Sequence, residues 1–424
     1  MTFQPTAAVT IELEDPLDDI DLSGESYGDA RVLVRLHREP LGIVCVPVRQ
    51  GSGRLRPETL MASVERELGA ALGAHLDRFG CRADEPVCAG RQAASGPYPS
   101  VSVIVPTAAR PERLRSCLAS IMNLTYPGFE AIVVDNRPDD PSTREVVDEL
   151  VARGHAVQYV SERFPGSAVA RNRGIAFSRA DIVAFTDDDV ELDPEWLDWL
   201  VEPFRLDPEV GVTCGLVLAG DLLTPAQRRF EDGVGFYKGF QRRAYDLACN
   251  RADDRLLYPF WGGIFGSGNS MAFRRDRLAA IGGFDPALGT GTPALGGTDI
   301  EVFTHMILRG SRLVYEPRSV CRHDHRRDDS SLDRQLYSYG VGFTAILAKW
   351  AVRDPRLWTA GLRAARLMAT RRHRVMATPA DHAQSARMNS IQRRGYLAGP
   401  YLYARSARWA SRLGLRSVLP PSGA

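Results

Sequence analysis

From residue 101 onward, short apolar runs alternate with segments of helical period, and this alternation constrains the fold more than any other feature of the chain. Strands joined by helical crossovers form a parallel sheet with helices on both faces. The sequence therefore predicts an α/β domain over residues 99–330. Its expected strands are residues 101–105, 131–134, 157–160 and 181–185, with helices that begin between them near Pro111, Ser142 and Ser167.

Shorter regions flank this domain on both sides. Residues 1–27 are acidic and show no sustained period, which predicts a lead-in without regular structure. Residues 28–98 contain two alternating runs around a Pro40-Leu41-Gly42 turn, then a helical pattern over residues 57–79. They predict a small α+β accessory unit of a hairpin, a helix and a linker. Residues 331–424 are expected to form a basic helical appendage.

The net charge of +1 hides an uneven distribution. Residues 351–424 hold fourteen arginines against Asp354 and Asp381, an excess of +12, so the rest of the chain is acidic. Arginines interleaved with aromatic residues suit an anionic membrane surface, and the alternative is a solvated helical tail. Nucleic acid is not expected as a partner, because no other segment of the chain resembles a motif that recognises bases.

The seven cysteines are scattered and include no C-x-x-C pair, which argues against a disulfide framework or a zinc site and favours a reducing compartment. Cys81 and Cys88 could pair, but two incidental thiols are the preferred interpretation. The sequence shows neither a leader nor an apolar stretch of about 18 residues. We therefore expect a cytoplasmic protein that could lie peripherally at the inner face of the cell membrane.

Three polar clusters follow expected strands: Pro106-Thr107, Asp135-Asn136 and Asp187-Asp188-Asp189. Ligands of such sheets bind outside the carboxyl ends of the strands, so the clusters should converge on one edge. Three adjacent carboxylates repel one another, and a hard divalent cation removes that cost while it accepts phosphate oxygens. The alternative is a solvated turn before a helix capped at Asp193-Pro194, a motif that leaves the triplet unexplained.

Two later segments add candidates for catalysis and metal binding. Thr298 and Glu301 have the spacing of a capping box, which places Asp299 in the first turn of a helix. Asp299 is either a general base held at a fixed angle or a carboxylate that only stabilises the helix dipole. Either histidine of His323-Asp324-His325 could complete a metal shell, in which Mn²⁺ would suit imidazole better than Mg²⁺, and the alternative is a surface loop with paired histidines.

Glycines cluster between residues 262 and 291 and permit close backbone approach to a ligand. Residues 289–294 match the dinucleotide pattern G-x-G-x-x-A, but no apolar strand precedes them, so a dinucleotide site is discounted. A Walker loop is excluded because neither of the two lysines, Lys238 and Lys349, follows the needed glycines. Trp261 is a candidate platform for an acceptor sugar and equally a candidate core tryptophan.

In combination, these segments resemble family 2 of the GT-A glycosyltransferases, inverting enzymes that use nucleotide-sugar donors, over about residues 99–330. Ordered motifs at sensible spacings carry the resemblance. They are Val101-Ser102-Val103-Ile104-Val105-Pro106-Thr107, Val133-Val134-Asp135-Asn136, Ala170-Arg171-Asn172-Arg173-Gly174, Phe185-Thr186-Asp187-Asp188-Asp189, Gly268-Asn269 through Arg274-Arg275, and Gly282-Gly283-Phe284-Asp285.

The resemblance implies a Rossmann-like GT-A fold and a role for each candidate residue. The residues that would bind the nucleotide sugar are Pro106, Thr107, Asp135, Arg171, Asp187 and Asp188. The ligands of a divalent metal, Mn²⁺ or Mg²⁺, would be Asp189, Asp187 and His323. Asp299 would be the catalytic base, and the acceptor would contact Trp261, Gly268 and Asn269. Thr298 stands where the family has a glutamate, which puts any acceptor contact from that carboxylate in doubt.

The predicted function is metal-dependent, inverting transfer of a hexosyl or deoxyhexosyl group from a nucleotide-diphosphate sugar to a hydroxyl of a glycan or lipid-linked acceptor. Two rival functions use some of the same residues. If the chain were a nucleotidyltransferase, the helix that carries Asp299 and the residue His323 would have no functional role. A non-catalytic nucleotide-sugar-binding protein would be expected to have lost Asp299 or the aspartate triplet.

Overall fold

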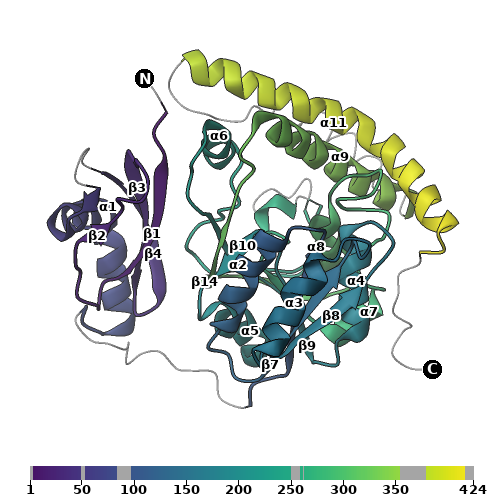
Figure 1. The fold of residues 1–424 in the computed structure, drawn as a ribbon, viewed down its shortest axis with the longest axis horizontal. Coiled ribbons are helices and arrows are strands. Elements are labelled where there is room, and N and C mark those ends of the chain that lie inside the picture. The colour runs from purple at the N-terminus through teal and green to yellow at the C-terminus, as the bar shows by residue number, and fades with distance from the viewer. Residues whose placement is uncertain are drawn as a thin grey trace.

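The computed structural model describes residues 3–48, 53–83, 97–249, 258–260, 262–353 and 379–415, and in the last segment the side chains from residue 386 on. Figure 1 shows a small N-terminal unit, a central α/β domain, and two long helices, α9 (Asp329–Arg353) and α11 (Pro379–Arg412), that run side by side along one edge. The predicted fold class is therefore confirmed: a mostly parallel sheet with helices, a small α+β unit and C-terminal helices.

The central sheet has nine strands in the order β10-β14-β11-β13-β9-β6-β7-β8, with β12 paired to β14. One half is parallel, as the alternation of strands and helices predicted. In it, β6 (Val101–Thr107) lies between β7 (Phe129–Asp135) and β9 (Ile182–Phe185), and β8 (Val157–Ser161) forms the edge. Thr107 stands opposite Asp135, so the carboxyl ends of these strands are level.

The other half of the sheet contains antiparallel strands. β13 (Met271–Arg274) lies antiparallel between β9 and β11 (Val210–Ala219), and β14 (Arg312–His323) runs parallel to β11. Two short strands, β10 (Val190–Leu192) and β12 (Arg243–Tyr245), pair antiparallel with β14. Val190 stands opposite His323 in this register, which brings Asp189, the residue before β10, to the end of β14.

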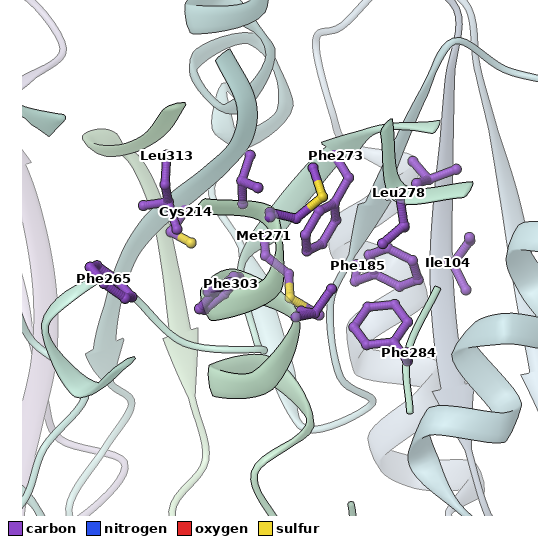
Figure 2. Close-up of a cluster of buried hydrophobic side chains, with 14 of the residues drawn as sticks. Ile104, Phe185, Cys214, Phe265, Met271, Phe273, Leu278, Phe284, Phe303 and Leu313 are labelled. Atoms are coloured by element: carbon purple, nitrogen blue, oxygen red, sulfur yellow. The ribbon is translucent and has the colours of Figure 1, made fainter. Parts of the chain in front are cut away.

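Helices cover both faces of the sheet, because alternate residues of its strands are apolar on both sides. Val101, Val103 and Val105 of β6 face α2 (Pro111–Met122), α3 (Ser142–Ala152) and α5 (Trp196–Leu206). Ile104 faces the opposite core, which includes residues of α4 (Ser167–Phe177), α7 (Arg275–Ala280) and α8 (Thr298–Leu308). In Figure 2 its aromatic centre is Phe185, Phe273, Phe284 and Phe303.

The N-terminal unit is larger than the sequence predicted. The expected lead-in over residues 1–27 contains β1 (Thr6–Glu12), which pairs in parallel with β3 (Asp29–Leu36). Its prediction as a segment without regular structure is wrong over these residues, because their partner strand lies about twenty residues away and the local sequence does not reveal it. β2 (Ile20–Asp21) and β5 (Arg54–Leu55) form a second, two-stranded sheet.

The predicted hairpin of this unit is confirmed, but its turn was misplaced. β4 (Glu39–Pro47) begins before Pro40-Leu41-Gly42, and the turn consists of His37 and Arg38, both with positive φ. Pro40 is tolerated inside β4 because the pairing shifts its register there. The predicted helix is α1 (Pro57–Phe79), which Gly80 ends in the left-handed conformation.

The C-terminal helices pack onto the α/β domain. The second half of α9 supplies core residues: Val341 and Ile346 are fully buried. α11 crosses α9 at close range, since a Cβ added to Gly395 would collide with the carbonyl oxygen of Tyr337. Among the described residues, no helix is both long and apolar enough to cross a membrane.

Candidate active site

A cavity of about 1510 Å³ lies at the carboxyl ends of β6, β7 and β9. Its floor carries Thr107 and the aspartate triplet, and the start of α8 forms one side. α9 and α11 contribute further wall residues, among them Tyr339, Gln392 and Tyr396. The basic C-terminal region is therefore part of the wall of this cavity, which the prediction of a separate appendage did not anticipate.

Arginines surround the aspartate triplet. Thr107 Oγ1 donates to Asp188 Oδ2 at 2.6 Å, and the Arg110 guanidinium lies 3.0 Å from Asp188 Oδ1. Burial raises the pKa of Asp188, and the neighbouring charge of Asp189 raises it further. Arg171 pairs with Asp187 at 3.0 Å, although burial raises the pKa of that carboxyl as well. The buried carboxylates of the triplet therefore need nearby positive charge to stay ionised, and the arginines supply part of that charge.

Asp189 is the most strongly paired member of the triplet. Its Oδ2 lies 3.1 Å from Arg113, 3.4 Å from Arg110 and 3.5 Å from Arg326. Its Oδ1 lies 3.4 Å from His323 Nε2. Burial raises the pKa of Asp189, but the charges of His323 and the arginines outweigh that effect and hold the pKa well below its ordinary value. Asp189 is therefore ionised at neutral pH.

A chain of hydrogen bonds fixes the tautomer of His323. Glu231 on α6 (Pro225–Gly233) pairs with Arg31 at 2.8 Å and accepts from His325 Nε2 at 3.1 Å. Burial lowers the pKa of His325, so this imidazole is neutral and its Nδ1 carries a lone pair. His323 Nδ1, 2.8 Å away, must then donate to it, while His323 Nε2 lies 3.4 Å from Asp189 Oδ1.

A divalent cation bound between Asp189 and His323 would take a carboxylate oxygen and the Nε2 lone pair of the neutral imidazole. Adjacent ligands of an octahedral Mn²⁺ or Mg²⁺ lie about 3.0 Å apart, from metal–ligand distances of about 2.1 Å. The 3.4 Å between Asp189 Oδ1 and His323 Nε2 is close to this value. Such a cation keeps open positions for substrate phosphates. The residues present therefore fit a divalent cation held by Asp189 and His323, whereas Asp187 is engaged by Arg171.

Asp299 and Arg171 both approach Gly268. Its Oδ2 accepts from the Gly268 amide at 3.0 Å. A Cβ added to Gly268 would lie 3.3 Å from the Arg171 guanidinium and 3.4 Å from Asp299 Oδ2. Because Gly268 has no side chain, the Asp299 carboxylate of α8 and the Arg171 guanidinium, which pairs with Asp187, can lie close to the same point.

The predicted capping box at the start of α8 is wrong. Gly297, with φ of 87°, is the N-cap, and Thr298 is the first helical residue. Glu301 instead points into the protein, where Lys349 Nζ lies 2.6 Å from its Oε1 and 2.6 Å from Asp285 Oδ2. The same lysine thus ties α9 to the helix that carries Asp299.

Most of the predicted site residues line this one cavity. These are Pro106, Thr107, Arg171, Asp187, Asp188, Asp189, Gly268, Asn269, Asp299 and His323. Asp135 does not reach it: the residue is fully buried, and its two oxygens accept from the Arg137 amide at 2.9 Å and the Tyr159 hydroxyl at 2.8 Å. Its neighbours Asn136 and Arg137 line the cavity in its place. The predicted acceptor contact Trp261 lies outside the described residues.

Several functional candidates were missed by sequence reasoning. Arg110 and Arg113 precede and begin α2, and Arg326 follows β14, but arginine is so common in this chain that none stands out. Lys238 gave a better signal, as one of only two lysines. It lines the cavity, and burial lowers its pKa.

Part of the chain is similar in sequence to glycosyltransferases. Residues 102–275 match the sequence profile of Glycosyl transferase family 2. The chain is 27% identical over 234 residues to the pre-mycofactocin glycosyltransferase of Mycobacterium tuberculosis, a match that covers 55% of this chain and 44% of that protein. It is 22% identical over 231 residues to the glucosyl-dolichyl phosphate glucuronosyltransferase of Haloferax volcanii, over 53% of this chain and 68% of that protein.

Solved structures resemble the chain more loosely. One is the mannosyltransferase PcManGT from Pyrobaculum calidifontis in complex with GDP-Man and Mn²⁺, which is 19% identical with a TM-score of 0.44 over 84% of this chain and 98% of that one. Another is GalNAc-T7 with UDP, GalNAc and Mn²⁺, which is 14% identical with a TM-score of 0.41 over 61% of this chain and 51% of that one.

Proposed function

Since residues 102–275 form a domain of glycosyl transferase family 2, we propose that this chain transfers a sugar from a nucleoside-diphosphate sugar to a hydroxyl group, with a divalent metal and with inversion at the anomeric carbon. The acceptor is a glycan or a lipid-linked sugar. The observation that carries the proposal is the position of Asp299, which lies beside Gly268 together with Arg171, the partner of Asp187. A base and a diphosphate site on two sides of one small space suit an in-line displacement.

The reaction exchanges one bond at the anomeric carbon and moves one proton. The acceptor oxygen bonds to the anomeric carbon while the bond from that carbon to the diphosphate oxygen breaks, and its electron pair leaves with the nucleoside diphosphate. The acceptor proton passes to Asp299. A divalent cation, when bound by Asp189 and His323, supplies charge neutralisation for the diphosphate. Arg110 and Arg326 stand beside Asp189 and add positive charge on the same side.

The first experiment is donor turnover over a panel of nucleotide sugars, with manganese and with excess chelator. Asp189→Asn and Asp299→Asn should each lower kcat by about a thousandfold or more, since each removes an interaction needed in the transition state. Asp148→Asn, on an exposed position of α3, is the matched control and should be unaffected. Full activity in chelator would refute metal dependence, and full activity of the Asp299 variant would refute its role as base.

The same panel separates the rival functions. A nucleotidyltransferase would release pyrophosphate from a nucleoside triphosphate, and a binding protein would take up donor without turnover. Either result would overturn the proposal. Release of a nucleoside diphosphate that depends on both an added acceptor and Asp299 would support it.

We further propose that α11 presents the site to an anionic membrane surface that carries a lipid-linked acceptor. Leu397 is 85% exposed and Tyr401 is 71% exposed, one turn apart, on the same helix that lines the cavity. Arg394, Arg405 and Arg408 are exposed along that helix. Apolar and basic side chains together suit a headgroup layer, where each basic residue contributes about 1 kcal/mol.

This membrane contact is tested with vesicles of phosphatidylglycerol and of phosphatidylcholine across a salt series. The chain should co-sediment with the anionic vesicles and be released as salt rises. Leu397→Glu/Tyr401→Glu should weaken binding, while Val151→Glu, at an exposed apolar position far from α11, is the matched control. Binding that ignores lipid charge, or that survives the double substitution, would contradict the proposal.

A further inference from the structure

A second group of metal-ligating side chains lies in the N-terminal unit, outside the cavity. His37, His75 and Cys81 are all buried, and their ligand atoms lie within 4.8 Å of one another. His37 comes from the β3–β4 turn, His75 from near the end of α1, and Cys81 from the residue after the Gly80 cap. The fold therefore brings together residues that the sequence separates, which is why the spacing of the cysteines did not reveal them.

The distances match a tetrahedral zinc site. With Zn–N bonds of about 2.0 Å and a Zn–S bond of about 2.3 Å, two nitrogens lie about 3.3 Å apart and a nitrogen and sulfur about 3.6 Å apart. His37 Nδ1 lies 3.1 Å from His75 Nε2 and 3.6 Å from Cys81 Sγ. His37 Nδ1 is thus within ligand-to-ligand distance of both other ligand atoms, an arrangement that a shared zinc ion would satisfy.

The surroundings supply what a metal-binding histidine needs. His75 Nδ1, the nitrogen away from the cluster, lies 3.2 Å from Glu39 Oε2. A carboxylate in that position fixes the tautomer and orients the ring, so that Nε2 presents its lone pair.

The backbone of His37 and Arg38 also has an unusual, left-handed conformation. His37 and Arg38 have φ of 52° and 65°, in a two-residue turn where asparagine and glycine are favoured. A non-glycine residue in this region costs free energy, and such positions concentrate at functional sites. The turn aims the His37 side chain at the end of α1, and the His37 amide is fastened to Glu14 Oε2 at 3.0 Å.

We propose that His37, His75 and Cys81 bind one zinc ion, with a fourth position left for water or another ligand. The ion ties the tip of the β3–β4 hairpin to the end of α1. The same hairpin holds the unit against the α/β domain, because Arg35 pairs with Asp193 at 2.7 Å. Zinc therefore stabilises the N-terminal unit and its docking, and the proposal is independent of the transferase reaction.

Cobalt(II) titration of the full-length, chelator-treated chain tests the proposal. One equivalent should produce a thiolate-to-cobalt charge-transfer band together with the visible bands of tetrahedral cobalt, and zinc should displace both. Asp189→Asn should keep the bands, because the cavity site supplies no thiolate from the residues described there. Cys81→Ser should lose them, and Cys45→Ser, an exposed cysteine of the same unit, should keep them.

Two further measurements keep the test decisive if the Cys81 variant fails to fold. Glu39→Gln retains all three ligands and should weaken zinc affinity by about 10- to 100-fold. Zinc should also raise the Tm of the wild-type chain in proportion to the logarithm of its free concentration. Absence of a thiolate band in the wild type, or an unchanged band in a folded Cys81 variant, would overturn the proposal. Glu39→Gln with wild-type affinity would do the same.

Discussion

Lys349 offers the sharpest test of how the base-bearing helix is held. The side chain is 6% exposed and pairs with both Asp285 and Glu301 at 2.6 Å. In Lys349→Met, Asp285 keeps the Ala287 amide and the Tyr403 hydroxyl as donors. Glu301 is 1% exposed and keeps His305 Nδ1 at 3.9 Å, which is too far for a hydrogen bond. The cost should therefore fall mainly on Glu301.

The expected loss is about 3 to 5 kcal/mol of the free energy of unfolding, the usual result of removing one partner from a buried ion pair. That is a large part of a typical stability of about 5 to 15 kcal/mol. Burial raises the pKa of Glu301 and Lys349 lowers it, so the pKa should rise further in the variant. A carboxyl whose folded pKa exceeds its unfolded value stabilises at low pH and loses that contribution as pH rises. The difference from wild type should therefore shrink on acidification from pH 7 to pH 5.

Urea unfolding at several pH values measures both effects. Lys349→Met/Glu301→Gln should recover part of the loss, because it removes the stranded charge. Arg353→Met, one turn along α9 at an exposed position, is the matched control and should cost under about 1 kcal/mol. A loss that is below 1 kcal/mol, independent of pH and unchanged by Glu301→Gln would refute the reasoning.

Three other outcomes are expected. Burial lowers the pKa of His305 to about 4, below its unfolded value of 6.5, so protonation favours unfolding. Stability should fall by up to about 3 kcal/mol between pH 6.5 and pH 4, and His305→Gln should remove that slope in urea unfolding. His325→Gln should weaken manganese activation by about 10- to 100-fold without abolishing donor binding, since it releases the tautomer of His323; an unchanged manganese requirement would refute this. Gly395→Ala should lower Tm because its Cβ meets the backbone of α9, whereas Gly69→Ala, with no atom within 4 Å, should raise it slightly.

The predictable parts of the site are the residues whose positions follow directly from the end of a neighbouring strand. The aspartate triplet follows an apolar strand, and the parallel arrangement then determines which edge it occupies. Asp299 was placed in the first turn of a helix, which the structure bears out even though a glycine, and not Thr298, caps that helix. Gly297 can take a left-handed conformation at no cost, and the burial of Glu301 removes it from any capping role.

The parts that were not predictable depend on contacts between distant residues. The tautomer of His323 is set through His325 by Glu231, which lies 94 residues earlier in sequence than His325. The pair of His37 and His75 is joined across 38 residues. The hydrophobic period of the sequence does not predict either contact, because both join residues that are far apart in the chain and meet only when a helix packs against the end of a strand.

The C-terminal helices connect these observations. A Cβ added to Gly342 of α9 would lie 2.7 Å from the amide nitrogen of Gly297, the residue that caps the helix of Asp299. Gly395 of α11 also makes a close contact with the backbone of α9. Small residues thus stack α11 on α9 and α9 on the start of α8, so a change in α11 can shift Asp299 without touching it. A chain cut near residue 350 would lose a wall of the cavity as well as its basic surface. Lost activity in such a truncation would therefore not measure membrane attachment, and only substitutions on the exposed face of α11, such as Leu397→Glu, can separate acceptor presentation from the geometry of catalysis.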